Sequence, residues 1–266
     1  MITIDQPPLV SIITPVYNGA EYLEELIQSV LQQDYLNIEH IIIDDGSTDN
    51  GATIAVLKRY PHLRWWSRGN KGQYQTLNEG IAAAQVAILG IISADDMYVT
   101  PNAISAVMSY WQLHPRFGCV YGRVLKVDED GHQLPLENYV EINGPFPLWL
   151  LRYKSLIYHC SLFIAKEIIT GNEIWFDPAF RYLGDWDWII RLSKTGCEFG
   201  FLDQILSKYR IYSGQFSSTA GVDLWLTETR AVCRRNGVNY GLCLLLKRVL
   251  NARYRALSAF FKCRTN

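Results

Sequence analysis

The feature that most constrains the fold is a regular alternation of short apolar runs and helical segments over the first 114 residues. The apolar runs are rich in β-branched residues and end at turn-forming residues, which is typical of buried strands. The segments between them repeat apolar residues at helical spacing. We predict strands at 9–14, 38–44, 63–67 and 86–92, and helices at 21–33, 47–60, 74–84 and 101–114. Strands that alternate with helices form βαβ units, which predicts an α/β fold with a mostly parallel sheet covered on both faces.

The second half of the chain is less regular but continues the α/β pattern. Apolar runs predict strands, and apolar residues at helical spacing predict helices. We predict a strand at 119–128, a short helix at 145–152, a helix at 182–194, strands at 199–202 and 205–212, and helical structure from 222 onward.

Residues suited to binding a ligand follow three of the predicted strands at the point where each strand ends. These residues are 14–17, 44–46 and 93–96. In open parallel sheets, ligands bind outside the carboxyl ends of the strands. We therefore expect these three segments to meet at one edge of the sheet.

Asp95 and Asp96 directly follow the strand predicted at 86–92. Two adjacent carboxylates repel each other unless a cation or hydrogen-bond donors are present, and Mg²⁺ and Mn²⁺ prefer oxygen ligands. The pair is consistent with a metal–diphosphate site. It is equally consistent with a solvated cap before the helix that Pro101 opens.

Asp45, Tyr17 and Pro15 are candidates for binding a nucleoside. Asp45 can accept a hydrogen bond from a base or ribose, although an Asp-Gly pair is also a common turn. Tyr17 and Pro15 can offer a flat apolar surface to a base, or they can pack under their loop.

A second acidic pair, Asp185 and Asp187, alternates with tryptophans at the start of a predicted helix. A carboxylate among apolar rings can act as a base, whereas acidic residues at a helix start also stabilise its dipole. His159 precedes an apolar run, where a buried structural histidine and a substrate contact are the two interpretations.

Composition excludes several classes of protein. The chain of 266 residues is 49% hydrophobic and 19% charged, which is ordinary for a globular protein. Its six cysteines form no C-x-x-C pair, and no secretory signal or long apolar span is visible. Nucleotide-binding and hydrolase motifs such as G-x-x-x-x-G-K-[ST] and G-x-S-x-G are absent. We expect a reducing, cytoplasmic compartment and no nucleic-acid partner.

Charge is distributed unevenly along the chain. From residue 231 onward there are eight basic residues and no acidic one, although the net charge is −1. Residues 241–262 repeat apolar residues at helical spacing with basic residues at the edge of that stripe, except for Arg253, which falls inside it. Such a helix can lie on an anionic membrane surface or pack on its own domain. The pattern favours neither alternative.

Taken in order, the motifs closely resemble the family 2 glycosyltransferases of the GT-A fold over residues 9–218. The motifs that carry the resemblance are 10–18, 42–49, Asn70 and Gly72 with Asn78 and Gly80, 93–96, 184–188 with Arg191 and Leu192, and 209–210. The first and second motifs are specific when they occur together.

The resemblance implies a Rossmann-like, three-layer GT-A sandwich, a nucleotide-diphosphate-sugar donor, Mn²⁺ or Mg²⁺, and inverting transfer. By this resemblance Asp95 is the metal ligand supported by Asp96, and Asp185 is the general base, with Arg191 in the helix that follows. The residues matched to donor binding are Thr14, Pro15, Tyr17, Asp45, Asn70, Gly72, Ser93 and Asp95.

Two positions depart from the family pattern. The first Asp of D-x-D is Ser93, and the Glu of E-D is Gly184. Asp187 is a substitute for Asp185 as the base, and His159 and Arg191 are assigned acceptor-binding or structural roles.

We expect a GT-A domain at 1–220 and a basic amphipathic helical tail at 221–266. Within the domain, residues 1–100 form the donor-binding half and 101–220 the acceptor-binding half. The acceptor is a carbohydrate or a lipid-linked sugar, as in polysaccharide or glycolipid biosynthesis. A lipid-linked acceptor suits peripheral contact of the tail with the inner face of a membrane.

Two rival functions stay open. One is a catalytically inactive nucleotide-sugar-binding protein, which Ser93 and Gly184 allow. The other is a sugar nucleotidyltransferase, which normally has a Gly-rich loop with Lys or Arg after its first strand, where this chain has Pro15 to Gly19.

Overall fold

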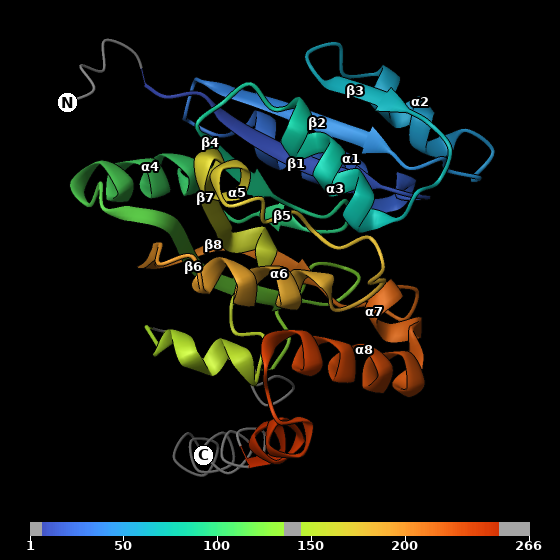
Figure 1. The fold of residues 1–266 in the computed structure, drawn as a ribbon. Coiled ribbons are helices and arrows are strands. Elements are labelled where there is room, and N and C mark those ends of the chain that lie inside the picture. The colour runs from blue at the N-terminus through green and yellow to red at the C-terminus, as the bar shows by residue number, and fades with distance from the viewer. Residues whose placement is uncertain (1–6, 136–144, 250–266) are drawn as a thin grey trace, which may run out of the picture.

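The computed structural model describes residues 7–135 and 145–249. These residues form one eight-stranded mixed sheet in the order β3-β2-β1-β4-β7-β6-β8-β5 (Figure 1). The strands are β1 (Val10–Val16), β2 (Ile38–Asp44), β3 (Arg64–Ser67), β4 (Ile88–Ile91), β5 (Met97–Tyr98), β6 (Phe117–Val127), β7 (Leu162–Ala165) and β8 (Glu198–Arg210). The expected α/β architecture is confirmed.

The half of the sheet built from the first hundred residues is parallel. β1 pairs with β2 on one side and with β4 on the other, and β2 pairs with β3. Each of these strands coincides with a predicted strand to within about two residues at most boundaries. The carboxyl ends of β1, β2 and β4 therefore meet at one edge of the sheet.

The other half mixes directions. β7 is antiparallel to both β4 and β6, whereas β6 and β8 are parallel. The two strands predicted at 199–202 and 205–212 are a single strand, β8, and that prediction was wrong. Register shifts opposite residues 121–124 of β6 accommodate the polar pair Asp203 and Gln204, so the strand continues through them.

Helices cover both faces of the sheet and give it three layers. One face carries α1 (Ala20–Leu31), α2 (Ala52–Lys58) and α4 (Ala103–Leu113). The other carries α3 (Gln73–Ala83), α5 (Lys166–Gly171), α6 (Gly184–Ser193) and α8 (Gly221–Asn236). Shorter elements are η2 (Leu148–Arg152), η3 (His159–Ser161) and α7 (Phe216–Thr219). The helix predicted at 145–152 is the 3₁₀ turn η2.

The region beyond residue 220 packs on this framework. α8 lies against α6, and Val232 and Cys233 of α8 are buried in the same core as Trp186. The predicted amphipathic helix at 241–262 is helical over 240–249, and residues 250–266 lie outside the described part of the chain. Among the described residues, no helix is both long and apolar enough to cross a bilayer.

A carboxylate from α8 holds the backbone that leads into α6. The Glu228 carboxylate accepts the backbone N–H groups of Arg181 at 2.7 Å, Tyr182 at 2.9 Å and Leu183 at 2.7 Å. Glu228 is itself buried. Because a carboxylate forms strong hydrogen bonds with backbone N–H groups, this one side chain fixes the start of α6.

A buried histidine links the first two strands. His40 Nε2 lies 3.1 Å from Thr14 Oγ1, and both side chains are enclosed in the core. Burial lowers the pKa of His40 from 6.5 to about 3, and the nearby His62 adds to this shift. His40 therefore stays neutral in the folded protein at pH values where the unfolded chain takes up a proton.

The lowered pKa makes folding acid-sensitive. Stability is retained above pH 6.5 and is lost as the pH falls from about 6.5 toward 3, because only the unfolded chain binds the proton in that window. Between pH 7 and pH 5, we expect the free energy of unfolding to fall by about 2 kcal/mol more in the wild type than in His40→Gln, because the variant lacks this titrating group. Urea unfolding at both pH values measures it, with exposed His132→Gln as control. Equal acid sensitivity of wild type and His40→Gln would contradict this assignment.

The Glu228 contacts predict a stability effect that depends on its charge. Glu228→Gln leaves one acceptor oxygen and no charge for three N–H groups, so we expect the free energy of unfolding to fall by about 2 kcal/mol. Asp223→Asn, at an exposed position of the same helix, is the matched control and should change it by less than about 0.5 kcal/mol. Thermal and urea unfolding check both values, and similar effects for the two variants would argue against the anchoring role.

Candidate active site

Three polar side chains from distant parts of the sequence meet at the carboxyl edge of the sheet. Ser93 Oγ lies 3.0 Å from His159 Nε2, and His159 Nδ1 lies 3.6 Å from Asp185 Oδ2. Ser93 follows β4, His159 lies in η3, and Asp185 is in the first turn of α6. The side chains of His159 and Asp185 remain 13% and 27% exposed, so a ligand at this edge can reach them.

Strand pairing explains why His159 stands beside Ser93. β4 and β7 are antiparallel, with Gly90 opposite Phe163. The end of β4 therefore lies next to the start of β7, where η3 ends. The sequence pattern predicted the strand before Ser93 but gave only an apolar run after His159, and it did not indicate that the two segments are neighbours.

Asp95 and Asp96 occupy different surroundings. Asp96 is buried and accepts the Arg210 backbone N–H at Oδ1 (3.1 Å), whereas half-buried Asp95 accepts the Gln215 amide at Oδ2 (3.3 Å). Burial raises the pKa of Asp95, and burial together with the charge of Asp95 raises the pKa of Asp96 well above its usual range. The negative charge of this pair is thus poorly compensated.

This acidic pair suits a hard divalent cation. Among the described residues, Asp96 Oδ2 accepts no hydrogen bond although it is buried, and no Lys or Arg side chain forms an ion pair with Asp95. Carboxylate oxygens are the ligands that Mg²⁺ and Mn²⁺ prefer. Asp95 is the accessible member of the pair, so the residues present fit the expected metal.

Arg210 fixes the backbone around Asp95. Its Nε donates to the Asp95 carbonyl at 3.1 Å, and its two terminal nitrogens bind the Glu129 carbonyl and the Glu25 carboxylate. The guanidinium carbon also lies 4.2 Å from the ring centre of Tyr22. A buried arginine is thus used to position the acidic segment.

The residues expected to bind the nucleoside are assembled around Asp45. Its carboxylate accepts the backbone N–H groups of Lys71 at 2.8 Å and Gly72 at 2.9 Å, and it pairs with Arg68. Asn70 Oδ1 accepts the Gly72 N–H at 3.1 Å. The structure therefore brings Asp45, Asn70 and Gly72 together, and it uses Asp45 to shape the loop before α3.

The residues at the end of β1 divide between the interior and the surface. Thr14 is fully buried with its hydroxyl on His40, so its side chain does not face the sheet edge. Pro15 is half-buried. Tyr17 is 49% exposed, with its hydroxyl 3.5 Å from Thr48 Oγ1, and can present its ring to a ligand.

Asp187 and Arg191 are not brought to the edge that carries Asp185. Asp187 is fully buried, where it accepts Arg191 Nε at 2.7 Å and the Asn236 amide at 2.9 Å. Arg191 also donates to the Trp175 carbonyl at 2.7 Å. Both side chains join α6 to neighbouring segments, which is a structural arrangement.

The space beside Gly184 is filled by a tyrosine. A Cβ on Gly184 would lie 2.5 Å from the Tyr74 ring. The Tyr74 hydroxyl accepts the Gly184 N–H at 2.9 Å and donates to the Tyr182 carbonyl at 2.8 Å. At the position where the family pattern has Glu, this chain therefore has a glycine whose backbone N–H binds the Tyr74 side chain of α3.

Sequence reasoning did not find the residues that hold this site in place. These are Arg68, Tyr74, Arg210 and Glu228. Arg210 belongs to a motif that carried the family resemblance, so a signal for it was present. Tyr74 and Glu228 are ordinary members of amphipathic helices, and nothing in their spacing marks them.

A second acidic cluster lies in the turn after β6. Ligand-type atoms of Asp128, Asp130 and His132 lie within 4.8 Å of one another, largely exposed. The Asp128 carboxylate accepts the N–H groups of Asp130 and His132 at 3.1 and 2.8 Å. These bonds account for the cluster as a turn.

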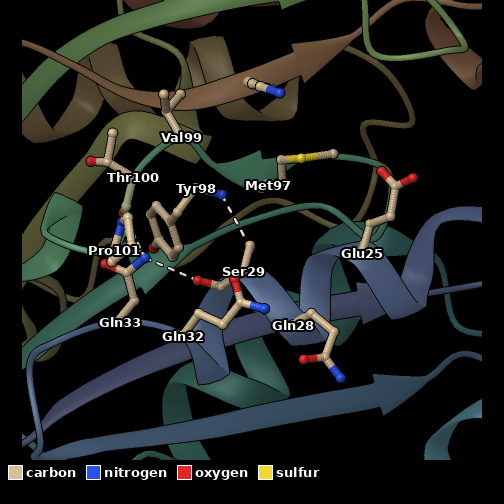
Figure 2. Close-up of a pocket in the computed structure, with 11 residues that line it drawn as sticks. Glu25, Gln28, Ser29, Gln32, Gln33, Met97, Tyr98, Val99, Thr100 and Pro101 are labelled. Carbon is tan, nitrogen blue, oxygen red and sulfur yellow. Dashed lines mark hydrogen bonds between the residues drawn. The ribbon is translucent and has the colours of Figure 1, made fainter.

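A groove of about 320 Å³ lies between α1 and residues 97–101 (Figure 2), and Asp185 is not one of the residues that line it. Its polar groups bind one another: Tyr98 N–H donates to Ser29 Oγ at 3.2 Å, and Gln33 donates to the Thr100 carbonyl at 2.9 Å. These hydrogen bonds therefore join α1 to the segment that follows Asp96.

Comparison with known sequences identifies relatives. The sequence matches the family described as Glycosyl transferase family 2 over residues 11–179. An uncharacterized glycosyltransferase of Rickettsia felis is 34% identical over 218 residues, covering 79% of this chain and 35% of the relative. Chondroitin synthase of Escherichia coli is 26% identical over 231 residues, covering 84% and 32%. The chain spans about a third of the length of both relatives.

Solved structures share the fold. S. aureus TarS in complex with UDP-GlcNAc is similar with a TM-score of 0.67 and 18% identity, over 85% of this chain and 65% of that one. Mannosyltransferase PcManGT from Pyrobaculum calidifontis, in complex with GDP-Man and Mn²⁺, gives 0.63 and 18%, over 96% and 74%. The likeness confirms the expected GT-A fold. Because the family match covers more than half of the sequence, this chain belongs to glycosyl transferase family 2.

Proposed function

We propose that the chain transfers a sugar from a nucleotide-diphosphate-sugar donor to an acceptor hydroxyl, with inversion at the anomeric carbon. The observation that carries this proposal is the meeting of Ser93, His159 and Asp185 next to Asp95. His159 lies close enough to Asp95 to oppose the burial-driven rise in its pKa. A proton acceptor thus stands beside a candidate diphosphate site, which is what such a transfer needs.

Asp185 is the general base in this proposal. It removes the proton from the acceptor hydroxyl, whose oxygen attacks the anomeric carbon as the bond to the diphosphate breaks. His159 stands between the two other side chains, with Nδ1 3.6 Å from Asp185 Oδ2 and Nε2 3.0 Å from Ser93 Oγ, and in this proposal its ring orients the carboxylate. Orientation of a base by a third group is common in enzymes that activate a nucleophile.

Asp95, supported by Asp96, would hold Mn²⁺ or Mg²⁺. When bound there, the cation supplies positive charge against the diphosphate leaving group. The poorly compensated charge of the two carboxylates supports this role. PcManGT carries Mn²⁺ together with its nucleotide sugar, which is consistent with it.

The donor nucleoside is placed between Tyr17 with Pro15 and the loop that Asp45 organises. The exposed Tyr17 ring offers a stacking surface, and Asn70 and Gly72 line the loop. TarS and PcManGT bind different nucleotides, UDP-GlcNAc and GDP-Man, so both are suitable probes. The chondroitin synthase relative favours a carbohydrate acceptor in polysaccharide synthesis, and a lipid-linked acceptor is the other candidate.

Replacing the base separates the two acidic residues of α6. We expect Asp185→Asn to keep the melting temperature and donor binding while sugar transfer, or donor hydrolysis by water, falls by a factor of about 100 or more. Asp187→Asn should lower the melting temperature, because Arg191 loses its buried partner, and should keep activity below that temperature. Release of nucleoside diphosphate from UDP-GlcNAc and GDP-mannose measures both.

The opposite pattern, with Asp187→Asn inactive and Asp185→Asn active, would reassign the base. Donor binding without any release by the wild-type chain would favour an inactive nucleotide-sugar-binding protein. Release of a nucleoside triphosphate from donor and pyrophosphate would favour a nucleotidyltransferase.

The metal assignment also has a matched control within the chain. Asp95→Asn should abolish the increase in UDP affinity that Mn²⁺ produces, because one oxygen ligand is lost at the candidate site. Asp130→Asn, in the exposed cluster after β6, should leave that increase unchanged. Calorimetric titration of UDP with and without Mn²⁺ checks this, and loss in Asp130→Asn alone would move the metal to the turn.

A further inference from the structure

The helix at 240–249 exposes an apolar stripe. Leu242, Leu245 and Val249 are 42%, 56% and 43% exposed, and their spacing of three and four residues puts them on one side of the helix. Leucine and valine side chains in such a row would gain free energy if their apolar surface were removed from water. Their common direction therefore marks an outward-facing surface.

The opposite side of the same helix is already committed to the core. Cys243 is buried, with its sulfur 3.5 Å from the Tyr153 carbonyl. Lys247 Nζ lies 4.1 Å from the ring centre of Trp186 and 4.7 Å from that of Trp225. Because these contacts fix the helix from inside, its outer stripe is presented in one direction.

A tryptophan is exposed on the neighbouring turn. Trp149 of η2 is 57% exposed, and its ring lies edge-on to Tyr153, the residue that contacts Cys243. Figure 1 shows the yellow-green η2 segment and the red helix 240–249 at the end of the molecule remote from β3 and α2. Tryptophan is the residue type favoured at membrane–water interfaces.

The charge of these segments has one sign. Residues 145–156 and 236–249 contain no Asp or Glu, whereas Arg152 and Arg248 are exposed on them. The chain as a whole has a net charge of −1, so this end differs from the rest of the surface. Apolar and aromatic side chains flanked by arginines match a bilayer of anionic lipid.

We propose that this end of the molecule binds the surface of an anionic membrane, with helix 240–249 lying in the headgroup plane. The surface is called the docking face and consists of Trp149, Arg152, Leu242, Leu245, Arg248 and Val249. A second copy of the chain fits less well. A symmetric contact would pair this surface with itself, so that Arg152 and Arg248 of one copy would face the same positive residues of the other. An anionic lipid surface satisfies the apolar and the basic residues together.

Vesicle flotation of the full chain tests the docking face directly. We expect the protein to float with phosphatidylcholine vesicles that contain 25 mol% phosphatidylglycerol, to stay in solution with pure phosphatidylcholine, and to be released by high salt. Absence of flotation with the anionic vesicles at low salt would overturn the proposal.

Variants at exposed positions localise the binding. The double variant Leu242→Glu, Leu245→Glu should bind at least tenfold more weakly, and Arg248→Gln about fivefold more weakly with a smaller salt dependence. Leu36→Glu, at a leucine that is 94% exposed in the loop before β2, is the matched control and should bind like wild type. Unchanged thermal unfolding in all variants confirms that folding is intact.

Two results would contradict the docking face. In the first, the double variant binds anionic vesicles as tightly as Leu36→Glu. In the second, analytical ultracentrifugation shows a wild-type dimer that the double variant converts to monomer while vesicle binding is unchanged, which would make this face a contact between copies.

Discussion

Asp185 has its position because side chains from two other helices bind the backbone that enters α6. Glu228 of α8 takes three consecutive N–H groups, and Tyr74 of α3 takes the next one, at Gly184. The Gly184 N–H is buried and the other three are partly buried, so without these partners the buried donor alone would cost about 1–3 kcal/mol. The geometry of Asp185 and His159 at the sheet edge therefore depends on helices far away in the sequence.

Much of the fold and the edge that carries the site could be predicted, because strand and helix periods differ and strand ends carry polar residues. The orientation of Thr14 could not. β1 is buried on both faces, so its residues show no alternation of polar and apolar side chains that would indicate a direction. Asp45 was predicted at the correct edge, but its use in shaping a loop follows from Arg68 and residues 71–72, which only the folded chain brings near.

Helix geometry would have separated Asp185 from Asp187. Residues two positions apart point to nearly opposite sides of a helix, so only one of them can face the sheet edge. The structure places Asp187 in the interior against Arg191 and leaves Asp185 partly exposed. Glu228 could not be found this way, because its partners are backbone groups and these leave no trace in a pattern of side chains.

Lys247 lies on the ring of Trp186, and Trp186 directly follows Asp185 in the chain. Helix 240–249 therefore contacts α6 at the residue next to Asp185. Because Lys247 and Cys243 both pack into the interior, a chain that ended before this helix would lose a support beside α6.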